Sequence, residues 1–114
     1  MDLLVRHERS SRVDQPDVVH LSGDVDLATI PRLADALIKA VDSSTGTTPL
    51  VVDLDGVVVL DDAALGLLLG AAGRLRTAGR DLVVACTTPT LRHRLARTGF
   101  ERAVRVIDSI SAVG

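Results

Sequence analysis

The stretch that decides the fold is residues 50–72, which read LVVDLDGVVVLDDAALGLLLGAA. Residues 50–54 have little polar interruption, as expected of a central strand that is covered on both faces. Asp55-Gly56 then predicts a turn, and residues 57–60 predict a short extended piece after it.

A helix is expected next. It should begin at Asp61 or Asp62, because a carboxylate there can accept the free N–H groups of the first turn. It should run to about Thr77, with Gly79 as its natural stop. The stretch therefore predicts a strand followed by a helix, the repeating unit of α/β proteins.

The same unit extends outward in both directions. Helices are expected after the N-cap residues Thr29 and Thr88, each closely followed by proline, and the second should run through Arg97. Further strands are expected at residues 3–9, 18–22 (ended by Gly23), 81–86 and 104–107, with one helical turn after the last. The polar link 10–17 is hairpin-sized and favours an antiparallel first pair. We therefore predict one α/β domain over residues 1–114, in the order β-β-α-β-α-β-α-β, with a mostly parallel sheet and an antiparallel N-terminal strand.

Composition narrows the function. The chain has 114 residues and a net charge of −2, which leaves no basic stripe for nucleic acid or anionic lipid. Phe100 is the only aromatic residue, which argues against a base-stacking surface. Cys86 is the only cysteine, so an internal disulfide or a cysteine metal cluster cannot form. The N-terminus does not resemble a signal peptide and no apolar run is long enough to span a membrane, so we expect a cytoplasmic protein.

The helix expected after residue 60 has more apolar surface than it needs to cover one face of a sheet. One face suffices to cover a sheet, namely Leu65, Leu68, Leu69, Ala72 and Leu75. Small or apolar residues also occupy the rest of the helical wheel: Ala63, Gly66, Leu67, Gly70 and Ala71. Each glycine costs about 0.5–1 kcal/mol relative to alanine inside a helix. We interpret this surplus as a partner-facing surface; the alternative is that both glycines face the protein's own sheet or a neighbouring helix.

Several segments together resemble the STAS domain, the fold of bacterial anti-sigma-factor antagonists. Gly23-Asp24-Val25-Asp26 is similar to its turn after the second strand, and residues 59–66 are similar to the segment that opens its second helix. The resemblance implies a non-enzymatic regulator without a cofactor, which binds an anti-sigma factor, a kinase-like protein of the GHKL type, and so releases a sigma factor. It implies docking through the residues Asp24, Asp26, Asp61, Asp62, Ala63, Ala64, Gly66, Leu67 and Gly70.

The chain departs from the family at the switch. Antagonists of this family are phosphorylated on a serine or threonine at the helix start, which breaks the complex. The matching position here is Ala63, which has no hydroxyl group. We therefore expect no phospho-switch there; the lower-ranked alternative is that Asp62 imitates a permanently phosphorylated state. A second hypothesis for the whole chain is a STAS-like accessory subunit of a larger assembly, such as a transport ATPase.

Other chemistry is less well supported. Asp53 and Asp55 together with the aspartates above could gather at one sheet end, as in a Mg²⁺-dependent phospho-receiver. The first strand, however, ends in Arg9-Ser10 instead of an acidic pair, and no lysine follows the last strand. The histidines His7, His20 and His93 are scattered, without catalytic or metal-ligand spacing.

Overall fold

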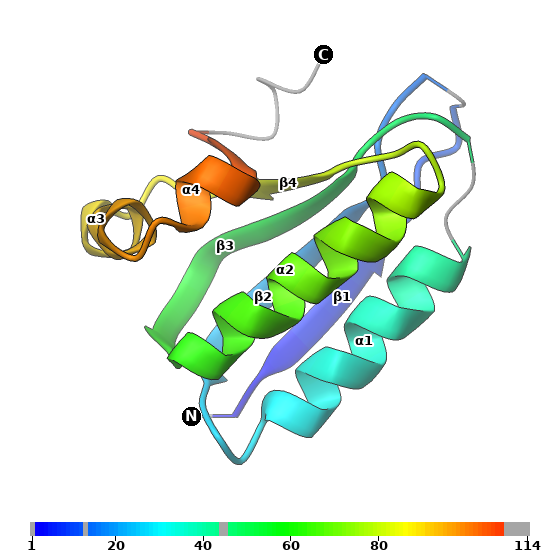
Figure 1. Ribbon diagram of the computed structural model, residues 1–114. Coiled ribbons are helices and arrows are strands. Elements are labelled where there is room, and N and C mark those ends of the chain that lie inside the picture. The colour runs from blue at the N-terminus through cyan, green and yellow to red at the C-terminus, as the bar shows by residue number, and fades with distance from the viewer. Residues whose placement is uncertain (1, 13, 44–45, 109–114) are drawn as a thin grey trace.

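A computed structural model describes residues 2–12, 14–43 and 46–108 of the chain. Strands and helices alternate through it, as Figure 1 shows. Their bounds are β1 (Leu4–Glu8), β2 (Val18–Val25), α1 (Ile30–Ser43), β3 (Leu50–Leu60), α2 (Asp62–Thr77), β4 (Leu82–Ala85), α3 (Pro89–Arg97), α4 (Phe100–Ala103) and β5 (Arg105–Ile107). The helical turn predicted after the last strand falls on residues 109–114, which lie outside the described residues.

The five strands form one sheet in the order β1-β2-β3-β4-β5. β1 pairs antiparallel with β2, and every other neighbouring pair is parallel. This confirms the predicted α/β class and the mostly parallel sheet with an antiparallel N-terminal strand. The reason is the length of the connections: a short polar link joins β1 to β2, whereas each parallel pair is joined through helix.

The predicted turn at Asp55-Gly56 is wrong, because both residues lie inside β3, which is one strand of 11 residues. Gly56 lies opposite Ser22 of β2, in a pairing that shifts register between His20 and Ser22. A Cβ atom on Gly56 would lie 2.7 Å from the Ser22 Cβ, so this glycine serves a close approach of two strands. In the same way β2 continues past Gly23, whose φ of 94° is a left-handed value within the strand.

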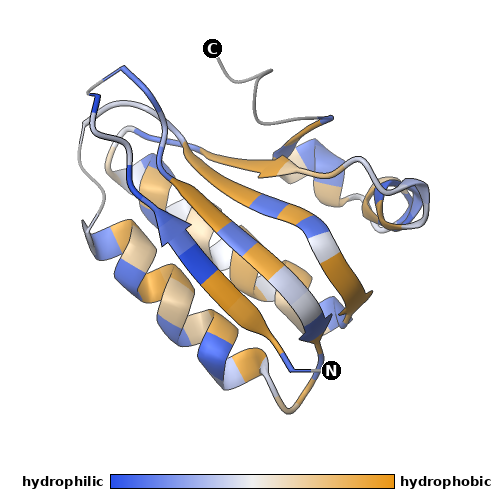
Figure 2. Cartoon of the chain, turned by 180° about the vertical axis from the view of Figure 1, so that it is seen from behind, coloured by the Kyte–Doolittle hydropathy of each residue, from blue (hydrophilic) through white to orange (hydrophobic). Residues whose placement is uncertain are grey.

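The core lies between the sheet and one helical layer. Figure 1 shows α1 and α2 side by side on one face of the sheet, and Figure 2 shows the opposite face, with α2 behind the strands and α1 beside the edge of the sheet. The side chains that alternate toward the helices include Val19, Val52 and Val84, each at most 1% exposed. The intervening residues form a second buried cluster on the other face: Val18, Val51, Val83, Ala85 and Ile107.

The helix starts agree with the predicted boundaries, and Thr29 and Thr88 directly precede α1 and α3, although neither hydroxyl caps its helix. Thr29 is buried, and its hydroxyl donates to the Asp24 carbonyl at 2.9 Å instead of binding its own helix. The Asp26 carboxylate accepts the N–H groups of Ala28 and Thr29 in the turn that leads into α1. Asp61 caps α2 by accepting the Ala63 N–H at 2.8 Å.

The C-terminal helical segment has one element more than predicted. α3 ends at Arg97 as expected, but α4 follows directly after Gly99, which has a left-handed φ of 81°. Within the described ranges, no helix combines the length and the apolar character needed to cross a bilayer.

We predict that Gly56→Ala destabilises the fold by about 1–3 kcal/mol, because the added methyl group would overlap Ser22 and force the two strands apart. Urea denaturation measures the loss. Gly66→Ala is the control, since a Cβ atom there would meet nothing within 4 Å. A Gly56→Ala variant as stable as the native chain would contradict the close approach.

Candidate protein-binding surface

The exposed side of α2 is a ridge of small residues. Ala63, Gly66, Gly70 and Gly73 are all exposed, and we call the first three of these residues, Ala63, Gly66 and Gly70, the α2 ridge. Cβ atoms added to the three glycines would meet no atom outside the helix backbone within 4 Å. Neither the protein's own sheet nor a neighbouring helix therefore requires glycine at these positions.

Three neighbouring residues lie differently from their expected places. Ala64 is 0% exposed and belongs to the core, since it shares a face with Leu68 one helical turn later. Leu67 is half-buried and packs against the core on the α1 side. Leu69, expected on the sheet-covering face, is instead 40% exposed. Spacing alone allowed either leucine to face the sheet, and the helix rotates so that Leu67 contacts α1.

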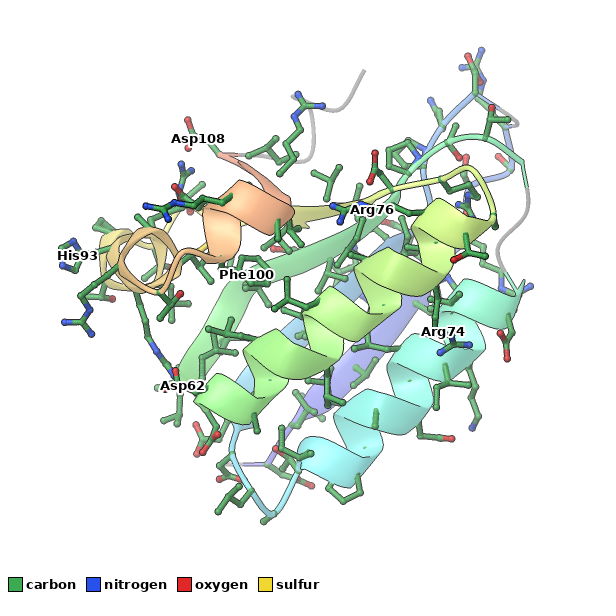
Figure 3. All side chains as sticks on the ribbon, in the orientation of Figure 1. Asp62, Arg74, Arg76, His93, Phe100 and Asp108 are labelled. Carbon is green, nitrogen blue, oxygen red and sulfur yellow. The ribbon has the colours of Figure 1, made fainter. Side chains whose placement is uncertain are left out.

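Two apolar hollows flank the α2 ridge, and Gly66 lines both. The hollow toward α3 and α4 has a volume of about 340 Å³ and contains Leu69 and Phe100. Figure 3 shows Phe100 pointing from α4 toward α2. The hollow toward α1 has a volume of about 210 Å³ and contains Ile38 and Leu67. The ridge is therefore bordered on both sides by apolar surface.

The structure brings the two predicted motifs together at one end of the sheet. The Asp61 backbone N–H donates to the Val25 carbonyl at 2.7 Å, which joins the start of α2 to the end of β2. Asp24, in the last residues of β2, and Asp26, directly after that strand, therefore lie beside Asp61 and the α2 ridge. Three apolar residues in these segments are exposed although the sequence did not predict it: Leu27, Val58 and Val59, at 75%, 68% and 46%. The run of valines at 57–59 was the only signal for Val58 and Val59, and none pointed to Leu27.

Asp62 is held by an ion pair. Its carboxylate accepts from the Arg94 guanidinium of α3, and Figure 3 shows Asp62 on the side of α2 that faces α3. Asp61 is occupied as the helix cap. Both aspartates thus have structural partners, while the Asp62 side chain is still 78% exposed and can contact a protein bound to the ridge.

The other predicted carboxylates do not converge on a metal site. Asp53 contacts His20 Nδ1 at 2.8 Å, and Asp55 accepts the Thr87 N–H and hydroxyl. Among the described residues, no group of three or more histidine, cysteine or acidic side chains could hold an ion. These contacts give no support to the phospho-receiver alternative.

The pKa values of two groups, the Glu8 carboxyl and the Cys86 thiol, are shifted by their structural surroundings. The hydrogen bond from His20 lowers the pKa of Glu8, with smaller contributions from the charges of His20 and Arg6. Burial raises the pKa of the Cys86 thiol, which is 0% exposed. Cys86 therefore packs as a small buried apolar residue.

We predict that Asp61→Ala lowers the free energy of unfolding by about 1 kcal/mol, because the Ala63 N–H loses its side-chain acceptor. Chemical denaturation measures the change. Asp61→Ser is the matched control and should retain most of the stability, since its hydroxyl can still cap the helix. Equal losses in both variants would show that capping is not the role of this residue.

Comparisons with known proteins agree with this architecture. The family model described as STAS domain matches residues 9–113. Among curated proteins, no sequence matches the chain. An anti-sigma factor antagonist from Mycobacterium paratuberculosis has a similar structure, with a TM-score of 0.83 and 24% identity over 98% of this chain and 94% of that one.

Two further solved structures share the fold. The anti-sigma factor antagonist SpoIIAA in its unphosphorylated form gives a TM-score of 0.73 at 21% identity, over 96% of this chain and 93% of that one. A sulfate transporter family protein from Wolinella succinogenes gives 0.71 at 20% identity, over 92% and 85%. Because these identities are at most 24%, the structural similarity shows that the fold is shared. Family membership is shown by the family model. This chain therefore belongs to the STAS domain family.

Proposed function

We propose that this chain is a non-enzymatic, cytoplasmic regulator of the anti-sigma-factor antagonist type, which docks its α2 ridge on an anti-sigma factor. The observation that carries the proposal is a helix that keeps exposed glycines where alanine would fit. Family membership and the antagonists among its structural neighbours support the class of partner.

The ridge suits close contact with another protein backbone. Gly66 and Gly70 lie four residues apart on one exposed face and add no side-chain bulk. The hollows on either side offer apolar walls for side chains of the partner, and the exposed Leu69 lines the hollow toward α3 and α4. Asp24, Asp26 and Asp62 lie at one end of the ridge, where the exposed Asp62 side chain can contact a bound partner.

We further propose that docking is not controlled by phosphorylation at Ala63. This residue is exposed at the second position of α2, where the family's switch would require a hydroxyl group. Asp62 supports a phosphorylation mimic poorly, because its charge is ion-paired with Arg94. The partner is a kinase-like protein of the GHKL type, and its abundance would then set how much complex forms.

We predict that Gly66→Ala and Gly70→Ala each stabilise the free protein by about 0.5–1 kcal/mol, through helix propensity. Each should nevertheless weaken the complex about tenfold, or about 1.4 kcal/mol, because the methyl group would hold the partner backbone away. Calorimetric titration of the purified kinase-like anti-sigma proteins of the same genome measures the binding.

Gly73→Ala is the matched control. Gly73 is equally exposed but lies farther from the start of α2, so the variant should gain the same stability without losing affinity. Unchanged affinity in both Gly66→Ala and Gly70→Ala would exclude the ridge as the docking surface.

A second prediction concerns phosphorylation. After incubation with the partner kinase and ATP, the native chain should carry no phosphate near residue 63, whereas Ala63→Ser should gain one and release the partner. Peptide mass spectrometry measures the modification. Thr29 is the nearby hydroxyl to monitor; it is 6% exposed and donates to Asp24. A phosphate on Thr29 of the native chain would contradict the absence of a switch.

The likeness to a sulfate transporter family protein favours a second candidate function, that of an accessory subunit in a transport assembly. The same ridge would serve that contact. Co-purification from native lysate separates the two: a kinase-like anti-sigma factor supports the first proposal, and a transport ATPase supports the second.

A further inference from the structure

A cationic pocket lies at the end of the sheet opposite the start of α2. Its lining comes from the segment before β3, the end of α2, the α2–β4 loop and the first residues of β4 and β5: Thr47, Pro49, Arg76, Gly79, Arg80, Asp81, Leu82, Val83 and Arg105. The pocket has a volume of about 310 Å³. This is near the lower limit of cavities that bind small molecules, about 300 Å³.

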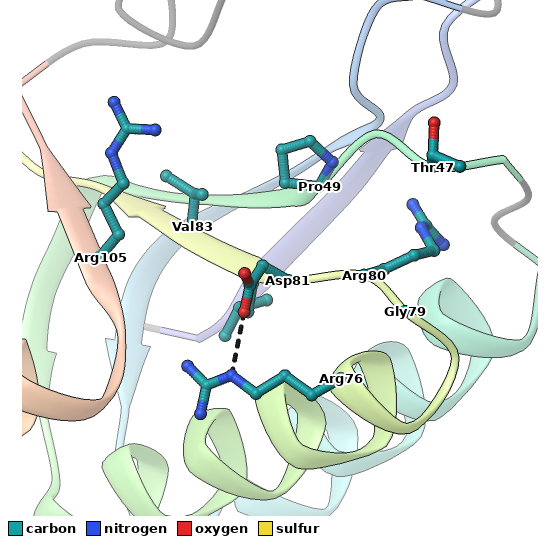
Figure 4. A pocket seen from close by; sticks show the side chains of 9 residues that line it. Thr47, Pro49, Arg76, Gly79, Arg80, Asp81, Val83 and Arg105 are labelled. Atoms are coloured by element: carbon teal, nitrogen blue, oxygen red, sulfur yellow. Dashed lines mark hydrogen bonds and ion pairs between the residues drawn. The ribbon is translucent and has the colours of Figure 1, made fainter.

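The lining is positively charged although the whole chain is not. Three arginines and one aspartate give these side chains a charge of +2, whereas the chain carries −2. Figure 4 shows Arg76, Arg80 and Arg105 placed around the pocket, on α2, the α2–β4 loop and β5 respectively. Three cationic side chains around one hollow make its electrostatic potential positive, which attracts an anion.

The arginines are held in different ways. Arg76 Nε lies 2.9 Å from the Asp81 carboxylate, and another nitrogen of Arg76 donates to the Ala103 carbonyl. Arg80 is only 7% exposed, and its Nε donates to the Thr48 carbonyl at 2.8 Å. Arg105 is exposed, and across the described residues its guanidinium forms no hydrogen bond or ion pair. Two arginines are thus anchored in the wall, and Arg105 retains its donors.

We propose that this pocket binds a small oxyanion with more than one negative charge, of the phosphate or phosphate-ester class. Arg105 would donate to the oxyanion, for which the planar guanidinium is well shaped. Arg80 and Arg76 would contribute positive charge, which Asp81 partly offsets. The site does not depend on the proposed docking function, because it uses other residues at the opposite end of α2.

Inorganic phosphate is the probe for this site. The ¹⁵N-labelled full chain is titrated with phosphate at constant ionic strength, and the backbone amide signals are followed by NMR. We expect saturable shifts at Gly79, Arg80, Asp81 and Arg105. Shifts that stay linear, or that spread over the whole surface, would overturn the proposal.

Two variants with opposite expected effects sharpen the test. Arg105→Gln should weaken phosphate binding at least fivefold, whereas Asp81→Asn should strengthen it severalfold, because it removes the only negative charge of the lining. Arg97→Gln, on exposed α3, makes the same charge change as Arg105→Gln outside the pocket and should leave the affinity unchanged. An equal loss in Arg97→Gln and Arg105→Gln would show that only general charge attraction is measured.

Discussion

The burial of one side of α2 against the sheet is the constraint on which the rest of the structure depends. Ala64, Leu68 and Leu75 are each at most 1% exposed. Burying a leucine stabilises a fold by about 1.5–3 kcal/mol, so this face outweighs the helix-propensity cost of the glycines, about 0.5–1 kcal/mol each. Since a helix has 3.6 residues per turn, fixing this face also fixes which residues point outward.

The outward residues are where the helix departs from what stability alone would select. At Gly66 and Gly70 the surrounding space would accept alanine, and alanine would strengthen the helix. In the proposed function that stability is given up so that a partner backbone can approach closely. Leu67 and Leu69 show that a small rotation of the helix decides which leucine is buried. They are two residues apart, yet Leu67 packs toward α1 and Leu69 is exposed.

The charged residues of α2 stabilise the helix and differ in sign between its two ends. Asp62 lies in the first turn and Arg76 in the last, which is the favourable arrangement for the helix dipole. Each also takes part in a wider contact, Asp62 with Arg94 of α3 and Arg76 with Asp81 before β4. The docking surface that we propose is therefore acidic at one end of the sheet, and the pocket that we propose is cationic at the other.

Much of the fold could be predicted from local sequence. The α/β class, the antiparallel first pair, the helix starts at Ile30, Asp62 and Pro89 and the cap at Asp61 were all predictable, because capping and periodicity are properties of neighbouring residues. Asp55-Gly56 was not. A glycine there is equally compatible with a turn, and only the contact with Ser22, on another strand, shows that the strand continues.

The proposed sites were also only partly predictable from local sequence. Local sequence was enough to show that α2 has more apolar and small residues than one sheet face can use, and that Ala63 lacks a hydroxyl group. Three-dimensional packing was needed to show that Ala64 is buried, that Leu69 is exposed, and that Arg76, Arg80 and Arg105 line one pocket. The physical reason is that helix rotation and the meeting of distant segments depend on packing across the whole core, which no local pattern encodes.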